Sequence, residues 1–552
     1  MMPASRLRRP GPGRWATFLH PASLTAAFFC LLFFLEGLVF IPYLGLQNDE
    51  AIFSGTIYPP VGILYAVRIF RKRQIPLMIL SYMGTLKAFL YKPVFSVFGP
   101  SVWSVRIPAL LAGAATVWLL YLLVRRIAGT RAALAACALL ATDAAFVLTT
   151  CMDWGPVAIQ HLLLLGGMML LLRFHDSGRV LFLAAGFFVF GVALWDKALF
   201  TWALAGLAAG AAAVFPRHLR AKITRRNLAV AAVSLLVGAA PLVVYNIAQR
   251  METFRGNARF SSEGMGQKAT LLEWTIDGSA MFGYMVRNEP PPGPVRPRSA
   301  METLSIRLSD LCGQRQKGFL RYACILALGL LPWLWRTPAR KPMLFALIFM
   351  VVVWLQMAFT KDAGTSAHHT VLLWPFPHLL AGVGLAQASQ ALRRGGLAAL
   401  AVVLAVVCGS NLVVSNQYLA QLVENGPTTV WTDAINPLAA YLGTSPARHM
   451  YVTDWGIINS LRILDAGRLP LDLAPEESAG DPKSHAAALK TLESQDSIFV
   501  GHTAGNESVP GANARLDALA GSGGYRPETL SVIADRNRRP IFQVYRYVAA
   551  GR

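Results

Sequence analysis

Two adjacent acids, Asp49 and Glu50, stand where the first long apolar run of the sequence ends, in the stretch LQNDEAIFSG. No basic residue lies beside them to neutralise either carboxylate. A carboxylate in such a place can act as a general base that takes the proton of an attacking hydroxyl group. The pair could instead begin a short helix capped by Asn48 or Asp49, because acids are favourable at a helix N-terminus. Taken alone, the pair does not decide between these interpretations.

Further ionisable residues lie at the ends of other apolar runs. They are the basic residues Lys87, Lys92, Arg106 and Lys197, the acids Asp153 and Asp196, and the histidines His368 and His369. Each has a plain structural explanation when taken singly, such as a local ion pair between Asp196 and Lys197 or a solvated loop position for Asp153. Ionisable groups at membrane depth are costly and are functional candidates by default. Their gathering on one side of the membrane therefore predicts a single site there.

One carboxylate among several cations suits the displacement of a phosphate leaving group. A phosphate monoester has a second pKa of about 6, so it can depart without being protonated and no general acid is needed. Such a site must supply a base for the acceptor hydroxyl and positive charge for the departing phosphate. Hydrolysis of ordinary glycosidic bonds differs, because it usually needs two cooperating carboxylates.

The composition indicates which elements position these residues. The 552-residue chain is 55% hydrophobic and only 14% charged, and its mean hydropathy is +0.46. Soluble domains carry about 25% charged residues. Many apolar runs approach the roughly 20 residues that cross a bilayer. The sequence therefore predicts a mainly α-helical, polytopic integral membrane protein with the lipid bilayer as a partner.

About eleven transmembrane helices are predicted, near residues 24–46, 104–124, 132–150, 157–173, 180–196, 199–215, 228–247, 319–335, 342–360, 370–390 and 396–415. The short loops on one side are basic, whereas the opposite loops CMDWGP, WDKA and TKDAGTSAHH hold only Lys197 and Lys361 as basic residues. The positive-inside rule then predicts a cytoplasmic N-terminus and, with an odd number of spans, an extracytoplasmic C-terminus. The formal net charge of +22 fits this distribution. No nucleic-acid-binding motif accompanies it, so nucleic acid is not expected as a partner.

Three domains or segments are predicted along the chain. They are a basic cytoplasmic N-terminus (1–23), a transmembrane domain (24–415) with large extracytoplasmic loops at 47–103 and 248–318, and a small extracytoplasmic α/β domain (416–552). In the first loop, VGILYAVRIF and PLMILSYMGTL are too short to span a bilayer and are expected to lie along its interface as helices. The basic triplet RKR at 71–73 conflicts with an outside location, but long loops escape the charge rule. In the tail, MYVTDWG, SIFVG and IFQVYRYV are strand candidates between helix-like stretches.

Four stretches of sequence follow one another in a characteristic order. They are the acidic pair after span one, LKAFLYKPVFSVFGPSVWSVRIPALLAGAATVWLLYLLVRRIAG at 86–129, LLATDAAFVLTTCMDWGPVAIQHLLLL, and FGVALWDKALFTWALAG. Together they resemble the dolichyl-phosphate-mannose protein mannosyltransferase superfamily and its bacterial relatives, including the lipid A aminoarabinose transferases. The resemblance covers roughly residues 24–390. It implies the C-type glycosyltransferase (GT-C) fold, a polyprenyl-phosphate sugar as donor, and inverting transfer to an acceptor hydroxyl on a protein, a glycan or a lipid.

The same resemblance implies roles for individual acids and for one lysine. Asp49 matches the family's catalytic acid and would be the general base, with Glu50 as its companion. Asp153 matches the acid of the second loop, a candidate for the acceptor site or for a place beside a metal. Lys197 in LWDKA aligns with the lysine of the family's LTKG motif, which would contact the donor phosphate.

Other residues are implied as substrate contacts. Lys92 stands where the family often has KPP, although Val94 replaces the second proline here, and Arg106 and Lys87 are further candidates for the donor phosphate. The segment AHHTVLLWPFPHLLAG resembles the family's RYxLPxxPxLAL block. The substrate-contact candidates from this block and from WDKA are His368, His369 and Asp196. Some relatives bind a divalent metal, and the acids and histidines could supply ligands, but no metal-spacing motif is present, so the metal stays open.

Three other functions compete with this interpretation. A secondary transporter would place charges or broken helices near the bilayer midplane and repeat its two halves. A ligase or polymerase of surface polysaccharide would use a lipid-diphosphate donor on the same side of the membrane, so only the donor chemistry separates it. A noncatalytic family member is the third, and the presence of both Asp49 and Lys197 argues against it.

Overall fold

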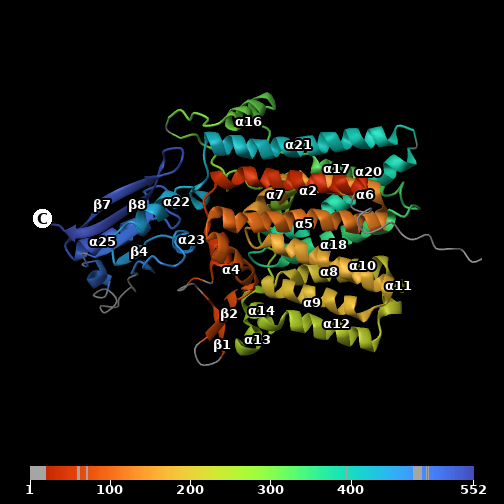
Figure 1. Cartoon of the computed structure of the whole chain (residues 1–552), viewed down its shortest axis with the longest axis horizontal. Coiled ribbons are helices and arrows are strands. Elements are labelled where there is room, and N and C mark those ends of the chain that lie inside the picture. Colours follow the sequence, from red (N-terminus) through yellow and green to blue (C-terminus); the bar gives the residue numbers. More distant parts are fainter. Residues whose placement is uncertain are drawn as a thin grey trace, which may run out of the picture.

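The computed structural model describes residues 20–56, 58, 63–69, 73–291, 293–392, 394–475, 488–492, 494 and 496–551. Most of the predicted basic N-terminus (1–23) and the first two residues of RKR therefore lie outside the described residues. The chain forms a bundle of long helices with a sheet-containing part at one end (Figure 1).

The helices of the bundle coincide with the predicted spans. They are α2 (Pro21–Phe40), α5 (Val102–Ala128), α6 (Thr130–Ala141), α7 (Ala144–Cys151), α8 (Val157–Ser177), α9 (Val180–Asp196), α10 (Phe200–Val214), α12 (Arg225–Gly238), α13 (Ala240–Ala248), α17 (Leu320–Leu330), α18 (Arg340–Phe359), α19 (Ala367–Thr370) with the 3-10 turn η3 (Val371–Leu373), α20 (Phe376–Ala391) and α21 (Gly396–Glu424). Five described helices are long and apolar enough to cross a membrane, or up to eight if each of three bent pairs is one span. The predicted number of eleven would also require the shorter apolar helices α9, α10 and α17 to cross. The mainly helical membrane architecture is confirmed, and the number of spans stays a prediction.

Small residues allow the central helices of the bundle to approach closely. Nearly every residue of α20 is buried, and a Cβ added at Gly382 would lie 2.7 Å from the backbone nitrogen of Ala136 in α6. Close backbone contact through small residues is the usual way that helices associate in a bilayer, where apolar burial between helices gains little. The break between α6 and α7 is held by Asp143, which caps α7 and accepts hydrogen bonds from Trp374 and His378.

The first loop contains helices and a small sheet. Its elements are α3 (Asn48–Gly55), β1 (Tyr65–Ile69), β2 (Arg73–Leu80), β3 (Met83–Gly84) and α4 (Leu86–Phe98). The strands form an antiparallel sheet in the order β1-β2-β3. The prediction that the two apolar stretches are interfacial helices is therefore wrong. The two stretches are similar in length, and pairing of β1 with β2 satisfies their backbone groups, while Pro76 disfavours a helix.

The three large nonspanning segments meet at one end of the bundle. The second loop contains α14 (Glu252–Asn257), α15 (Met265–Ile276) and α16 (Ala300–Leu311). Figure 1 shows β1, β2, α14 and the C-terminal sheet at the same end, whereas α11 (Pro216–Lys222), in the basic stretch PRHLRAKITRRN, lies at the other end. This distribution is the one that the sequence predicted, and the orientation across the membrane remains a prediction.

The tail forms the predicted α/β domain. Its elements are α22 (Ile435–Gly443), β4 (His449–Val452), α23 (Ile458–Leu464), β5 (Leu471–Leu473), β6 (Ser497–His502), α25 (Ala512–Ser522), β7 (Tyr525–Ala534) and β8 (Pro540–Ala549). The sheet order is β5-β4-β6-β8-β7, with β4 parallel to β5 and β6, and β8 antiparallel to β6 and β7. The predicted boundary at 415 falls inside α21, which continues to Glu424 because polar residues of its last turns bind α16, as Gln417 does in accepting a hydrogen bond from Ser309.

Candidate active site

The acidic pair lies in the first turn of α3, just after α2 and the short 3-10 helix η1 (Ile41–Tyr43). The Gln47 side chain accepts hydrogen bonds from the backbone nitrogens of Asp49 (2.7 Å) and Glu50 (3.3 Å). Glu50 in turn accepts one from the Gln47 nitrogen at 3.3 Å, which completes a capping box. The acids therefore do begin a helix, and the cap is Gln47 rather than Asn48 or Asp49.

Glu50 is neutralised by Arg106 of α5, and both side chains are 0% exposed. Arg106 Nε and Nη2 donate to the two carboxylate oxygens at 2.8 and 2.9 Å. The guanidinium also donates to the carbonyls of Leu44 (2.8 Å) and Gly45 (2.7 Å). Every side-chain nitrogen of Arg106 thus donates to a protein acceptor, and its predicted contact with the donor phosphate stays a prediction. Glu50, predicted as a companion catalytic acid, instead forms a buried ion pair with Arg106, which we call the Glu50–Arg106 clamp.

Asp49 is half-buried and receives hydrogen bonds without forming an ion pair in the described residues. The Asn48 side chain donates to Oδ1 at 3.3 Å, and the Trp154 indole donates to Oδ2 at 3.4 Å. Burial raises the pKa of Asp49 above its ordinary value, while these hydrogen bonds, one from Gln47 and the charge of Lys197 lower it in part. A carboxylate with a raised pKa is a stronger base, which suits proton abstraction from a hydroxyl group.

Aromatic rings from separate segments surround Asp49. The Trp154 ring stacks on Tyr284 with centroids 4.7 Å apart, meets Trp431 edge-on at 6.0 Å, and lies 4.3 Å from the His368 ring. Tyr284 belongs to the second loop and Trp431 to the short helix η4 (Thr429–Trp431) after α21. Tyr284 and Trp431 could not be recognised as site residues from the sequence, because they carry no charge and lie in no motif, whereas Trp154 stands beside Asp153 in CMDWGP.

Asp153 and Lys87 form a second buried ion pair, with Nζ and Oδ2 2.8 Å apart. Asp153 adopts a positive φ of 45° and also accepts a hydrogen bond from the Ala158 nitrogen, near the start of α8. Lys87 reaches it from the buried face of α4. The structure brings both predicted residues to the site, but as partners that neutralise each other. The roles predicted for them, an acceptor-site or metal-adjacent acid at Asp153 and a donor-phosphate contact at Lys87, stay predictions.

Lys197 follows α9 directly and is 1% exposed. Its ammonium donates to the Gly155 carbonyl at 2.9 Å. Gly155 has a φ of +76°, and a Cβ added there would lie 3.0 Å from Lys197 Nζ and 2.7 Å from His368 Cδ2. Burial lowers the pKa of Lys197 to about 8, against the opposing charges of nearby carboxylates that include Asp49. Lys197, His368 and the loop before α8 therefore form one contiguous group beside Asp49.

The remaining predicted residues divide between the site and its surroundings. In α19, His368 shares a hydrogen bond of 2.8 Å with Ser366, and the His369 ring lies 4.2 Å from the His368 ring. Asp196 is buried and accepts a hydrogen bond from Gln160 at 2.6 Å. The Asp196 side chain thus contacts α8, and its role as a substrate contact stays a prediction. Lys92 lies on the exposed face of α4, opposite the face that carries Lys87, so the structure does not bring it to the site, and its predicted phosphate contact stays a prediction.

A cavity of about 180 Å³ adjoins this site. It is lined by Tyr82, Leu199, Gly256, Asn257, Arg259, Thr360, Lys361, Asp362, Ala363 and His369. Arg259 and Lys361 are exposed, and their backbones are joined by a hydrogen bond of 2.8 Å. Burial and then the charge of Asp49 raise the pKa of Tyr82, so this cavity is electrostatically connected to Asp49. The sequence analysis missed Arg259, which stands in a long polar loop with no local pattern to distinguish it.

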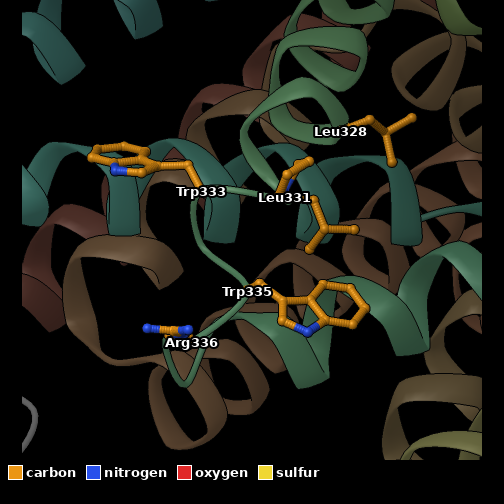
Figure 2. Close-up of a pocket in the computed structure, with 6 residues that line it drawn as sticks. Leu328, Leu331, Trp333, Trp335 and Arg336 are labelled. Carbon is orange, nitrogen blue, oxygen red and sulfur yellow. The ribbon is translucent and has the colours of Figure 1, made fainter.

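A second hollow, of about 730 Å³, lies at the other end of α18 and is shown in Figure 2. Trp333, Trp335 and Arg336 are among the six residues that line it, and none of the six is an acid. The Figure 2 view shows the two indoles extending to opposite sides of the chain between α17 and α18. Trp beside Arg is typical of a membrane–water interface. Without a carboxylate, this hollow cannot supply a general base.

The acids and histidines of the site do not converge as ligands. Among the described residues, no group of three or more His, Cys, Asp or Glu side chains is placed to hold a metal ion. Asp153 is paired with Lys87, Glu50 with Arg106, and Asp49 lies with amide and indole donors. A metal requirement therefore has no support from the ligand geometry of the described residues.

Comparisons with known proteins identify the fold. A family profile described as dolichyl-phosphate-mannose-protein mannosyltransferase matches residues 84–245. The solved structure of ArnT from Cupriavidus metallidurans bound to undecaprenyl phosphate is similar over 96% of this chain and 98% of that one, with a TM-score of 0.55 and 14% identity. The chain thus has the fold of that protein, and the predicted resemblance to GT-C proteins is confirmed.

Two further solved structures are similar at lower scores. They are the Archaeoglobus fulgidus oligosaccharyltransferase in complex with Zn and sulfate (TM-score 0.47, 12% identity, 85% of this chain and 68% of that one) and the arabinofuranosyltransferase AftD from Mycobacteria (TM-score 0.46, 15% identity, 95% of this chain and 39% of that one). No curated protein sequence matches the chain.

The clamp between Glu50 and Arg106 leads to a prediction about stability. Glu50→Gln or Arg106→Met alone leaves one buried charge without its partner, so each should lower the free energy of unfolding by about 3–5 kcal/mol. The double variant removes both charges and should lose less than the sum of the two single variants. Thermal unfolding of the purified protein in detergent measures these differences.

The exposed ion pair between Arg546 and Glu528 provides the matched control for this comparison of single and double variants. Because it is screened by solvent, Arg546→Met should cost less than about 1 kcal/mol. Equal losses for Arg106→Met and Arg546→Met would show that the clamp is not structural.

Proposed function

We propose that this chain is a membrane glycosyltransferase that moves a sugar from a polyprenyl-phosphate donor to an acceptor hydroxyl group, on the side of the membrane where the C-terminal domain lies. The observation that carries this proposal is a half-buried carboxylate with a raised pKa, Asp49, beside a buried ammonium and a cavity with two exposed cations. The predicted resemblance, the matching family profile and the fold support the same class of reaction.

The proposed step is a single displacement at the anomeric carbon. The acceptor hydroxyl oxygen forms a bond to that carbon while the bond from the carbon to the phosphate oxygen breaks, which inverts the configuration. Asp49 takes the hydroxyl proton, and the polyprenyl phosphate leaves with the bonding electron pair. Because a phosphate monoester has a second pKa of about 6, the leaving group needs positive charge rather than a proton.

The donor phosphate is proposed to bind in this cavity beside Arg259 and Lys361, which outnumber its one acid, Asp362. Arg259 can offer a planar fork to a phosphate, and Lys361 can add a point charge from the same wall. Lys197 stands two residues before Leu199, which lines the cavity, and its charge acts on Asp49. Lys197 therefore becomes the cation nearest to the reacting bond, and Arg259 and Lys361 hold the phosphate.

The test of this function combines a donor panel with a variant of the base. Purified protein is incubated with labelled polyprenyl-phosphate sugars, with the matching diphosphate oligosaccharides, and with candidate acceptors. We expect label to move from a monophosphate donor, and Asp49→Asn to reduce kcat by about 10²- to 10⁴-fold, because a general base contributes that much.

The thermal unfolding midpoint of Asp49→Asn serves as the control for folding and should match that of the unsubstituted protein. Transfer only from diphosphate donors would replace the proposal with a ligase or polymerase. An undiminished rate in Asp49→Asn would show that the base has been assigned to the wrong residue.

The cavity leads to a prediction about donor affinity. Arg259→Ala removes a charge-assisted contact with the phosphate, so KM for the donor should rise by about 10- to 100-fold. Arg255→Ala is the matched control, because Arg255 is an exposed arginine of the same loop that does not line the cavity. Steady-state kinetics with a varied donor concentration measures both. Equal KM values for the two variants would exclude Arg259 from the phosphate site.

The pKa shifts predict a bell-shaped dependence of kcat/KM on pH. Asp49 must be ionised to accept a proton, so the rate falls as the pH drops through its pKa, which lies above the ordinary value of 3.8. Lys197 must be protonated to attract phosphate, so the rate also falls as the pH rises through about 8. A profile of kcat/KM with no fall at either low or high pH would contradict both assignments.

A further inference from the structure

The C-terminal domain packs directly on the helix that carries Asp49. Its helix α23 lies between the sheet and the end of the bundle in Figure 1. Ile463 of α23 belongs to a buried cluster with Leu46 and Ala51. A Cβ added at Gly55 of α3 would meet Ile463 at an ordinary contact distance of 3.5 Å, so the two helices are in close contact. The C-terminal domain is therefore placed to act on the geometry of α3.

A chain of two hydrogen bonds leads from this domain to Asp49. The Asn459 side chain in α23 donates from Nδ2 to Oδ1 of Asn48 at 2.9 Å. Asn48 donates from its own Nδ2 to Oδ1 of Asp49 at 3.3 Å. Asn48 is buried at this interface. The last link of the chain is the carboxylate that we propose as the general base.

The direction of these hydrogen bonds is set by the chemistry of the groups. An ionised carboxylate only accepts, so Asn48 must present its amide nitrogen to Asp49. The Asn48 oxygen then faces Asn459, which must donate to it. A side-chain amide can be turned end for end at little cost in shape, so the donor from Asn459 decides which end of Asn48 meets Asp49.

We propose that Asn459 is a positioning residue for the general base: by holding the Asn48 oxygen, it keeps the Asn48 amide donor directed at Asp49 and so stabilises the ionised carboxylate in its working orientation. This inference rests on the function proposed above. The other charged or titratable groups that face Asp49 are Lys197, Tyr82 and Tyr284, and Glu50 is already paired with Arg106. None of these groups is changed by substitutions at position 459.

The decisive variant is Asn459→Asp, which keeps the shape of the side chain and removes its donor. The new carboxylate would accept from the Asn48 nitrogen, which turns the Asn48 oxygen toward Asp49. Asp49 then loses a donor and faces an acceptor, so its pKa should rise. The fall of kcat/KM at low pH, which we call the acidic limb of the profile, should then move up by about one pH unit. At a pH on the low-pH side of the profile, kcat should fall several-fold relative to the unsubstituted protein, while KM for the donor changes less than about twofold.

Two further variants separate positioning from charge and from packing. Asn459→Leu carries no charge and also frees Asn48, so the acidic limb should move in the same direction by a smaller amount. Ile463→Val loosens the packing of α23 on α3 without touching the hydrogen bonds, so it should lower thermal stability and leave the acidic limb in place. The proposal is overturned if Asn459→Asp and Asn459→Leu leave the limb unmoved, or if Ile463→Val moves it equally.

A second measurement does not depend on transfer. Carbodiimides modify protonated carboxyl groups, so the pH at which modification of Asp49 falls to half, followed by mass spectrometry of the full-length protein, reports the pKa of Asp49. This midpoint should rise in Asn459→Asp and Asn459→Leu, and stay unchanged in Ile463→Val. If no lipid-linked donor supports transfer but the midpoint shifts as expected, the proposed function fails and the positioning role of Asn459 stands. If transfer occurs but the midpoint is the same in all variants, the positioning role fails alone.

Discussion

The buried ion pair between Glu50 and Arg106 fixes the geometry on which the rest of the site depends. An isolated charge in a membrane protein interior is very costly, so the pair persists only because both partners and two loop carbonyls are satisfied together. Successive residues of a helix point about 100° apart, since each turn holds 3.6 residues. Once Arg106 holds Glu50 inward, Asp49 is directed away from the clamp and toward Trp154. The two adjacent acids therefore have different surroundings, because only Glu50 is paired with an arginine.

The presence or absence of a close cation also explains why Asp49 differs from the other acids around it. Asp153 has Lys87 as an ion-pair partner, and Asp143, deeper in the bundle, has an indole, an imidazole and two backbone donors. Asp49 has two long hydrogen bonds to its carboxylate oxygens, and the charge of Lys197 acts on it without direct contact. Burial without a close cation is the environment that raises the pKa of a carboxyl group. Glu50 and Asp153 are neutralised by close cations, and Asp196 is buried and held by Gln160. Asp49 differs from all three because it is only half-buried and has no close cation among the described residues.

The helical architecture could be predicted because it depends on local composition, whereas the pairing of side chains depends on contacts between distant residues. Apolar runs located every bundle helix, but nothing near Glu50 in the sequence indicated Arg106. The helical spacing of α4 does carry a signal for Lys87. Lys87 and Tyr91 are four residues apart and therefore share the buried face of the helix, whereas Lys92 falls on the other face. The strands β1 and β2 were missed because short apolar stretches near a membrane fit an interfacial helix equally well until their pairing is known. Arg259 had no local signal at all.

The C-terminal domain is held to the bundle by contacts of two kinds, and together they make it part of the site. Ile463 packs in an apolar cluster with residues of the first loop, while Arg536 donates to Glu302 at 2.7 Å and lies over the Tyr43 ring. Tyr43 itself donates to Glu302, so the turn before α3 is tied to the second loop and to the tail at once. The family profile matches residues 84–245, which include neither Asp49 nor Asn459. The matched segment supplies Arg106, Lys197 and the frame of the bundle, but the orientation of the proposed base is completed by chain that lies on both sides of it.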